Sequence, residues 1–144
     1  MLTKKGKYGL KAMVHLAEIG KGELASVNEI ATARHIPRKF LDNILTELRN
    51  AGFVHSRKGK GGGFCLARPA SEIRIGNIIR ILDGPLAPIS CASKTGYRSC
   101  EDCNEEDCEI RLMMLEVREA IAMVLDNKTL AETGAPAMDE FLKV

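Results

Sequence analysis

Apolar side chains recur every three or four positions through the first fifty residues, which is the spacing of helices that bury one face. This pattern predicts a first helix over residues 4–19, with Gly20 after its end. Residues 24–25 are expected to be a short link. A brief second helix is predicted after Ser26, because Ser26 and Glu29 have the spacing of a capping box.

A third helix is predicted over residues 37–50, since Pro37 suits the first position of a helix and Gly52 the position after its end. Two helices separated by only a couple of residues have the spacing of a helix-turn-helix motif. The buried face of this third helix is expected to hold five apolar side chains: Phe40, Leu41, Ile44, Leu45 and Leu48.

A basic, glycine-rich stretch follows the third helix. Phe53 and Val54 begin one run typical of a short strand, and residues 64–66 form another. Between them, residues 57–63 hold three Lys or Arg and four Gly, which predicts the tip of a hairpin. A hairpin placed directly after a helix-turn-helix is a wing.

The second half of the chain predicts two further helices. Residues 73–83 place Ile78, Ile79 and Leu82 inward, and Pro85 follows. Residues 109–125 have the most regular helical pattern in the chain, as a dimerising helix requires. Its apolar positions are Ile110, Met113, Met114, Val117, Ile121, Val124 and Leu125.

The expected fold is therefore mainly α with a small β-hairpin wing: a winged helix-turn-helix plus a long C-terminal dimerisation helix. We expect a DNA-binding domain over residues 1–84 and a cysteine-rich loop over residues 85–108. Residues 109–144 would form the dimerisation helix and a tail, the tail being a loose end or a short closing helix.

Composition narrows the class of protein. The 144 residues are 45% apolar and 28% charged, which is typical of a globular protein and not of a disordered chain. No apolar run is long enough to span a membrane, and the N-terminus does not resemble a secretory signal. We therefore expect a cytoplasmic protein, where thiols are normally reduced.

Charge is distributed unevenly along the chain. Residues 1–68 hold 13 Lys or Arg and 5 Asp or Glu, a formal charge of +8, whereas residues 69–144 carry −6. A basic first half indicates contact with nucleic acid, although uneven charge on solvated faces is also common. The predicted DNA-binding side chains lie on the third helix and the hairpin: Arg38, Lys39, Asn43, Thr46, Arg57, Lys58 and Lys60.

Four of the five cysteines lie within eighteen residues, with gaps of eight, two and four residues. They are Cys91, Cys100, Cys103 and Cys108, and the stretch around them is acidic. Thiolates favour zinc or iron–sulfur clusters, and the single close pair favours an iron–sulfur cluster, [2Fe–2S] above all, over zinc. A thiol–disulfide switch is the main alternative. Cys65, between Phe64 and Leu66, is expected to pack rather than react.

Catalytic arrangements are not found in the sequence. There is no Ser-His-Asp set or paired-carboxylate arrangement, so we do not expect an enzyme. The histidines His15, His35 and His55 lack metal-ligand spacing, and His15 is interpreted as a surface or core-filling side chain.

The chain resembles the Rrf family (type two) of bacterial winged-helix regulators in three places. These are the stretch LTKKGKYGLKAM, the stretch IPRKFLDNILTELRNAGFVHSRKGKGGGF, and the cysteine loop before a long helix. The group includes IscR-like and NsrR-like proteins. The resemblance implies a homodimeric transcription factor that reads a near-palindromic operator. In its sensor members, cysteines of this loop hold an iron–sulfur cluster whose state alters DNA affinity.

The cysteine loop departs from that family pattern. The better-known sensors carry three loop cysteines and take a fourth ligand from elsewhere, either a histidine or an acid of the partner's first helix. This chain has four loop cysteines, and Lys7 stands near the position of that acid. Other relatives have no cluster, and a cysteine-biosynthesis regulator of the family acts with an enzyme partner, so a cluster-free or zinc-stabilised regulator stays open.

Overall fold

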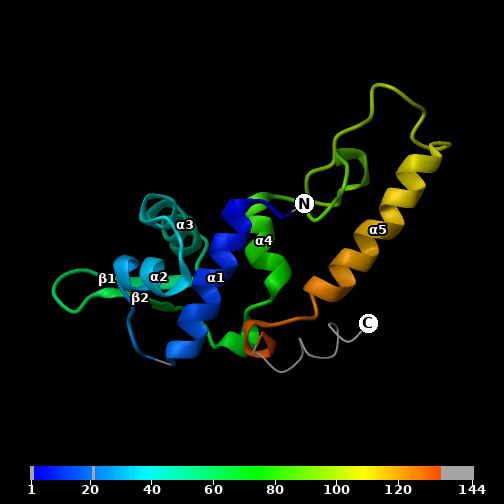
Figure 1. The fold of residues 1–144 in the computed structure, drawn as a ribbon. Helices are drawn as coiled ribbons and strands as arrows, with labels where there is room; N and C mark the ends of the chain where they lie inside the picture. The colour runs from blue at the N-terminus through cyan, green and yellow to red at the C-terminus, as the bar shows by residue number, and fades with distance from the viewer. Residues whose placement is uncertain (1, 21, 134–144) are drawn as a thin grey trace.

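The computed structural model describes residues 2–20 and 22–133. The mainly α fold predicted from the pattern is confirmed, with a two-stranded hairpin between the third and fourth helices (Figure 1). The elements in chain order are α1 Lys4–Ile19, α2 Val27–Arg34, α3 Arg38–Asn50, β1 Val54–Arg57, β2 Gly63–Leu66, the 3₁₀ turn η1 Ala70–Glu72, α4 Ile75–Asp83, the 3₁₀ turn η2 Ser90–Ala92, α5 Glu109–Leu125 and the 3₁₀ turn η3 Leu130–Glu132.

Helix α1 is the centre of the N-terminal part, with α2, α3, α4 and β2 around it. The apolar faces of these elements meet in one core, because each helix has its apolar side chains on a single stripe. The largest fully buried side chains include Met13, Leu16, Ile30, Leu41, Ile44, Leu45, Leu48 and Ile78.

The predicted helix-turn-helix is confirmed in its local chemistry. The Ser26 hydroxyl accepts a hydrogen bond from the Glu29 backbone N–H at 3.1 Å, and the Glu29 carboxylate accepts one from the Ser26 N–H at 3.0 Å. This capping box starts α2. Helix α2 ends at Arg34, and its C-cap His35, with a left-handed φ of 54°, turns the chain toward Pro37 and α3. Helix α3 therefore begins after a tight, non-glycine turn.

Phe40 was expected on the buried face of α3, and that prediction is wrong. Phe40 is 62% exposed, whereas the other four predicted positions are buried. Phe40 lies one helical step before Leu41 and thus at the edge of the apolar stripe. Its neighbour there is Tyr8 of α1, with the ring centroids 6.5 Å apart. The ring is thus left on the surface near the start of α3.

The wing is an antiparallel hairpin, as predicted, with Val54 opposite Leu66 and Arg57 opposite Gly63. Ala25, predicted to be a simple link, instead forms a β-bridge to Phe64 with backbone hydrogen bonds of 2.8 and 3.0 Å. A Cβ at position 63 would lie 2.5 Å from the Ala25 carbonyl oxygen, so only glycine fits beside this bridge. The bridge fixes the wing to the segment before α2.

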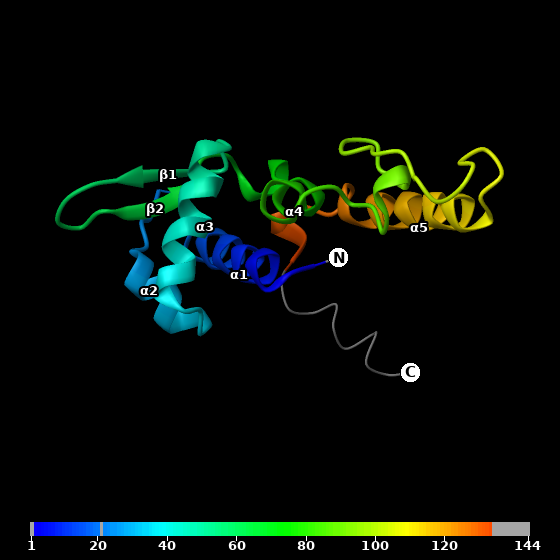
Figure 2. The same cartoon turned by 90° about the horizontal axis from the view of Figure 1, so that it is seen from above.

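Helix α5 extends away from the core and carries the cysteine loop to the end of the molecule opposite the hairpin (Figure 2). Its C-terminal end is anchored to the N-terminal part through α4. Arg80 of α4 binds both carboxylate oxygens of Asp126, at 2.7 and 2.8 Å. The chain then returns to the core, where Leu130 is 2% exposed and its N–H donates to Ile73. The predicted tail beyond Thr133 lies outside the described residues.

Across residues 2–20 and 22–133, no helix combines the length and the apolar character that a membrane span needs.

Candidate DNA-binding surface and cysteine loop

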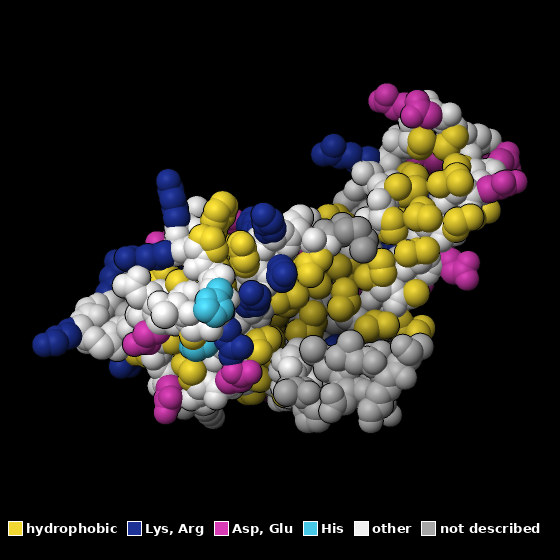
Figure 3. All heavy atoms as spheres, in the orientation of Figure 1, with side chains coloured by type: hydrophobic (Ala, Val, Ile, Leu, Met, Phe, Trp, Pro, Cys, Tyr) yellow, Lys and Arg dark blue, Asp and Glu magenta, His cyan; other side chains and the backbone are white. Residues whose placement is uncertain are grey.

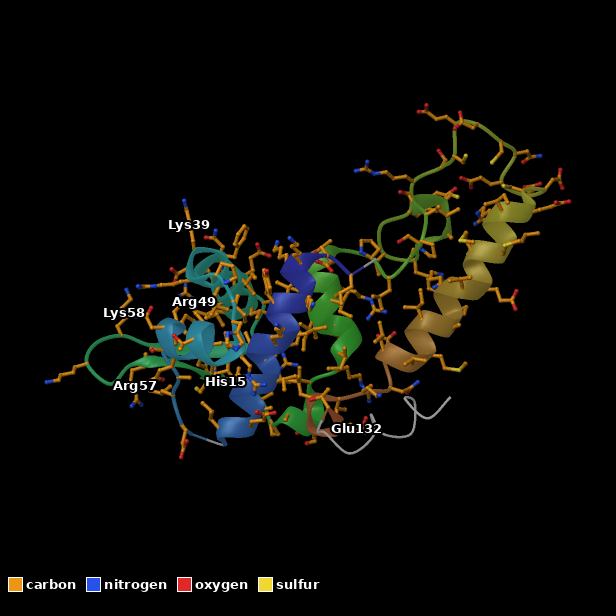
Figure 4. All side chains as sticks on the ribbon, in the orientation of Figure 1. His15, Lys39, Arg49, Arg57, Lys58 and Glu132 are labelled. Atoms are coloured by element: carbon orange, nitrogen blue, oxygen red, sulfur yellow. The ribbon has the colours of Figure 1, made fainter. Side chains whose placement is uncertain are left out.

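The seven side chains predicted to bind DNA are all exposed, and they lie on two neighbouring elements. Lys39 projects from the outer side of α3, and Arg57 and Lys58 project from the hairpin (Figure 4). Lys and Arg side chains gather over α3 and the wing, whereas Asp and Glu side chains surround the cysteine loop and the start of α5 (Figure 3). The charge asymmetry of the sequence is therefore an asymmetry in space.

The predicted set on α3 is Arg38, Lys39, Asn43 and Thr46, of which Arg38 and Lys39 are at the start of the helix. The Thr46 hydroxyl donates its proton to the Asp42 carbonyl at 2.8 Å, so this hydroxyl cannot also donate to a base. The oxygen of Thr46 can still accept a hydrogen bond, and its methyl group remains available for apolar contact with a base.

Arg49 is a basic side chain of this surface that the sequence reasoning missed. It is exposed, and its guanidinium donates to the Ser56 hydroxyl of β1 at 3.4 Å, linking the recognition helix to the wing. Steps of four and three residues lead from Asp42 through Thr46 to Arg49, so helical spacing could have identified it. Lys5 of α1 likewise forms an ion pair with Glu47 at 2.7 Å.

Helix α2 is held against α1 by a small polar network. The Arg34 guanidinium donates to Nδ1 of His15 at 3.2 Å and forms an ion pair with Glu18, and Lys11 donates to the Arg34 carbonyl at 3.3 Å. Burial, and secondly the Arg34 charge, lowers the pKa of His15, so the neutral imidazole that accepts this hydrogen bond is favoured. His15 therefore connects two helices instead of merely filling space.

Three of the four loop thiols lie together. The thiols of Cys100 and Cys108 flank that of Cys103, and these hydrogen-bonding neighbours, Cys100 first, raise the pKa of Cys103 to about 12. Cys108 is the N-cap of α5, where its sulfur accepts a hydrogen bond from the Arg111 backbone N–H at 3.4 Å. That backbone hydrogen bond is the main cause that lowers the pKa of Cys108.

Acidic and aromatic side chains shape the loop around these thiols. The Glu105 carboxylate accepts hydrogen bonds from the Cys100 backbone N–H at 2.7 Å and from the Tyr97 hydroxyl. These two donors, Tyr97 first, lower the pKa of Glu105. Part of the acidic sequence thus orders the loop backbone next to Cys100.

Cys91 is not brought together with the other three. It is 7% exposed in η2, and its backbone carbonyl accepts a hydrogen bond from the Arg111 side chain at 3.0 Å. Within the described part of the chain, no three His, Cys, Asp or Glu side chains are arranged to hold a metal ion. The soft, closely spaced thiols still fit the chemistry of an iron–sulfur cluster, since thiolates are its usual ligands. Cys65, by contrast, is half-buried in β2.

Helix α5 presents an exposed apolar stripe. Ile110, Met113, Val117 and Val124 are between 38 and 60% exposed, although they share one face of the helix. The stripe continues into an apolar groove of about 530 Å³ between α1, α4 and α5 (Figure 3). Contiguous exposed apolar side chains of this kind are typical of interaction surfaces.

The capped helix-turn-helix, the adjoining wing and the basic surface that they share define the chain as a winged-helix DNA-binding protein. The model of the Rrf2 family, described as an iron-dependent transcriptional regulator, matches residues 2–135. The chain belongs to the Rrf2 family, as the sequence resemblance predicted. It is a DNA-binding transcriptional regulator and not an enzyme.

Relatives of known sequence and structure agree with this assignment. An HTH-type transcriptional regulator of Rhodobacter capsulatus, described as rrf2-like, is 38% identical over 95% of this chain and 96% of its own. The structure of CymR, the global cysteine regulator of B. subtilis, is 32% identical with a TM-score of 0.75, and covers 92% of this chain and 94% of its own. The structure of T. potens IscR is 28% identical with a TM-score of 0.75, and covers all of this chain and 91% of its own.

Proposed function

We propose that the protein is a cytoplasmic, homodimeric regulator that senses iron–sulfur, redox or nitric oxide status through a cluster held by its cysteine loop. Residues 1–84 read DNA, residues 85–108 hold the cluster, and residues 109–144 join the two subunits. The observation that carries this proposal is the position of the three neighbouring thiols at the start of the helix whose apolar stripe is exposed.

In this proposal, each subunit places α3 in the major groove of one half-site. Arg38 and Lys39 reach guanine or phosphate, and Asn43 pairs with adenine. Arg57, Lys58 and Lys60 of the wing contact the neighbouring phosphates. The half-sites of a near-palindromic operator are about 34–36 Å apart, or a multiple of that, so the geometry of the dimer decides the fit.

The bound cluster, [2Fe–2S] in the first instance, supplies a redox- and nitric-oxide-reactive inorganic centre. Cys100, Cys103 and Cys108 would hold it, and Cys91 would have to approach to serve as the fourth ligand. Cys108 is the key residue for coupling, since it is both a ligand and the N-cap of α5. Ligation at Cys108 would therefore fix the direction in which the dimerisation helix α5 starts.

A cluster-free regulator is the second candidate, and the same three thiols favour it. Cys103 lies close to two other thiols, so oxidation could join it to either one as a disulfide. Zinc, which also takes thiolate ligands, is the alternative metal. These candidates differ in the metal content and in the thiol oxidation state of the purified protein.

The test is an anaerobic purification followed by counts of iron, sulfide and zinc per chain and a visible spectrum. DNA affinity is then measured with a near-palindromic duplex selected from a random library, for the loaded protein, the metal-free protein and Cys103→Ala. We expect coloured protein containing iron and sulfide, loss of most iron in Cys103→Ala, and a different DNA affinity in the metal-free forms. Cys65→Ala, in the wing, should retain its iron.

The alternative outcomes are distinct. Zinc without iron would favour the zinc-stabilised regulator, and metal-free protein whose DNA affinity follows oxidation would favour the thiol switch. Equal DNA affinity for loaded, metal-free and Cys103→Ala protein would refute sensing by the loop.

A further inference from the structure

A second cavity lies on a different flank of α5, away from both the DNA-binding surface and the three loop thiols. It has a volume of about 430 Å³ and is bounded by the C-terminal half of α5, by Arg80 of α4 and by the segment 86–95. This volume is within the range of pockets that bind small molecules. We call it the Arg118 pocket, after the buried side chain that lines it.

Arg118 is an unusual residue at such a position. It is 8% exposed, and its Nε–H has no hydrogen-bond partner among the described residues. Only Nη2 is engaged, by the neighbouring Glu119 carboxylate. Nε itself is shielded from solvent, but the Arg118 side chain lines the cavity with a guanidinium that is only partly hydrogen-bonded. Buried polar groups are nearly always paired, so this arrangement favours a ligand that binds the guanidinium from the cavity.

The charges of the lining favour an anion. Three basic side chains and two acidic ones line the pocket, and both acids are already paired. Asp126 gives its two oxygens to Arg80, and Glu119 binds Lys94 at 3.1 Å as well as Arg118. Because Lys94 and Arg118 share the single carboxylate of Glu119, the lining carries one net positive charge.

Further hydrogen-bond donors line the same pocket. The Ser93 hydroxyl, 7% exposed, accepts a hydrogen bond from the Gly96 N–H at 2.8 Å and keeps its own proton to donate. Lys94 and Thr95 lie beside it on the same wall. The remaining wall is apolar, with Leu86 and Met123 among its members. We propose that the Arg118 pocket binds a small organic carboxylate, whose charged group pairs with Arg118 and whose short apolar body contacts the apolar wall.

Helix geometry separates this pocket from the proposed dimer surface. Glu119, Ala122 and Asp126 lie on the flank of α5 opposite to Val117 and Ile121, since successive residues turn by about 100°. A second subunit docked on the apolar stripe would contact the flank of α5 opposite to Glu119 and Ala122, and only Leu86 and Ala87 line both the pocket and the apolar groove. A small ligand is therefore a better occupant than a side chain of the partner, and the site goes beyond the proposed cluster function because it uses none of the four loop cysteines.

The test uses the full-length protein labelled with ¹⁵N and follows the Nε–Hε signal of Arg118, assigned by its loss in Arg118→Lys. The probes are linear mono- and dicarboxylates of two to six carbons, the corresponding uncharged amides, and inorganic phosphate. We expect a saturable shift with at least one carboxylate, and binding weaker by about tenfold or more for its amide and for phosphate. Phosphate is the control for charge without an apolar body.

Two variants and a matched control accompany the titrations. Arg118→Gln should weaken carboxylate binding by about tenfold or more, and Arg98→Gln, an exposed arginine outside the pocket with the same change of charge, should leave it unchanged. If Arg118→Gln fails to fold, Lys94→Gln provides the test, because Lys94 is 70% exposed and its loss should weaken binding about two- to fivefold.

The absence of a saturable response to every carboxylate would overturn the proposal. Equal responses to carboxylates and amides would overturn it as well. An Arg118 signal that ignores all probes but shifts when the protein is diluted to monomers would assign the free donor to a side chain of the partner subunit instead.

Discussion

Replacing Lys58 and Lys60 of the wing by glutamine isolates the electrostatic part of DNA binding. Both lysines are exposed, and neither forms an ion pair within the described residues, so their substitution disturbs no contact of the fold. Each lysine is free to neutralise one phosphate. In a dimer the double substitution therefore removes up to four phosphate contacts.

The magnitude follows from counterion release. The logarithm of the binding constant falls with the logarithm of salt concentration by about 0.9 per phosphate neutralised. Losing four contacts should make that slope shallower by about 3.6. At about 0.15 M salt each contact contributes roughly fivefold, so the four together amount to about a thousandfold, or ~4 kcal/mol. This is an upper limit, reached if every lysine touches a phosphate.

The assay is fluorescence anisotropy with the selected near-palindromic duplex, repeated over a series of salt concentrations. The control is the pair Arg98→Gln and Lys128→Gln, which removes the same charge from exposed positions outside the wing and α3. A salt slope that is unchanged in the wing variant, or lowered equally in the control, would refute the assignment of the wing to phosphate contact.

Three further predictions concern the dimer and the stability of the fold. Val117→Asp, in the exposed stripe of α5, should dissociate the proposed dimer in sedimentation experiments, whereas Leu112→Asp, at a still more exposed position on the opposite flank, should not. Ser26→Ala removes the N-cap of α2 and should lower the free energy of unfolding by about 1 kcal/mol in urea titrations; no change would contradict the cap. The Arg80 hydrogen bond lowers the pKa of Asp126 below its ordinary 3.8, so wild-type protein should exceed Asp126→Asn in stability by up to about 1 kcal/mol near neutral pH. That advantage should be lost as the pH falls through the lowered pKa, and a difference that persists at lower pH would contradict the ion pair.

Local chemistry explains why much of the fold was predictable. The helical period placed α1, α3, α4 and α5 at nearly their observed bounds, and the Ser26 capping box marked the start of α2. These signals act over three or four residues and do not depend on distant neighbours. The hairpin was predictable for the same reason, since its basic glycine tip lies between two short runs typical of strands.

Contacts between distant segments were beyond such reasoning. The bridge from Ala25 to Phe64 and the exposure of Phe40 depend on where α1 and the wing lie, and no local pattern encodes that. For the candidate site, sequence spacing left open whether all four loop cysteines or only three of them are ligands. In the structure Cys100 and Cys108 are the thiol neighbours of Cys103, and Cys91 is buried in η2. A gap of eight residues leaves the chain too free for spacing alone to place Cys91.

The amino-acid sequence by itself determined the order of helices, the capped helix-turn-helix, the wing with its charges and the thiol-rich loop. Each of these features depends on residues that are close along the chain. The tertiary structure decided which surfaces remain open. Packing of α1 through α4 into one core leaves the α5 stripe exposed, and the return of the chain at Leu130 with the Arg80–Asp126 pair fixes the end of that helix. Burial of Arg118 beside a cavity was likewise settled only by packing, since it requires α4, α5 and the segment 86–95 to meet.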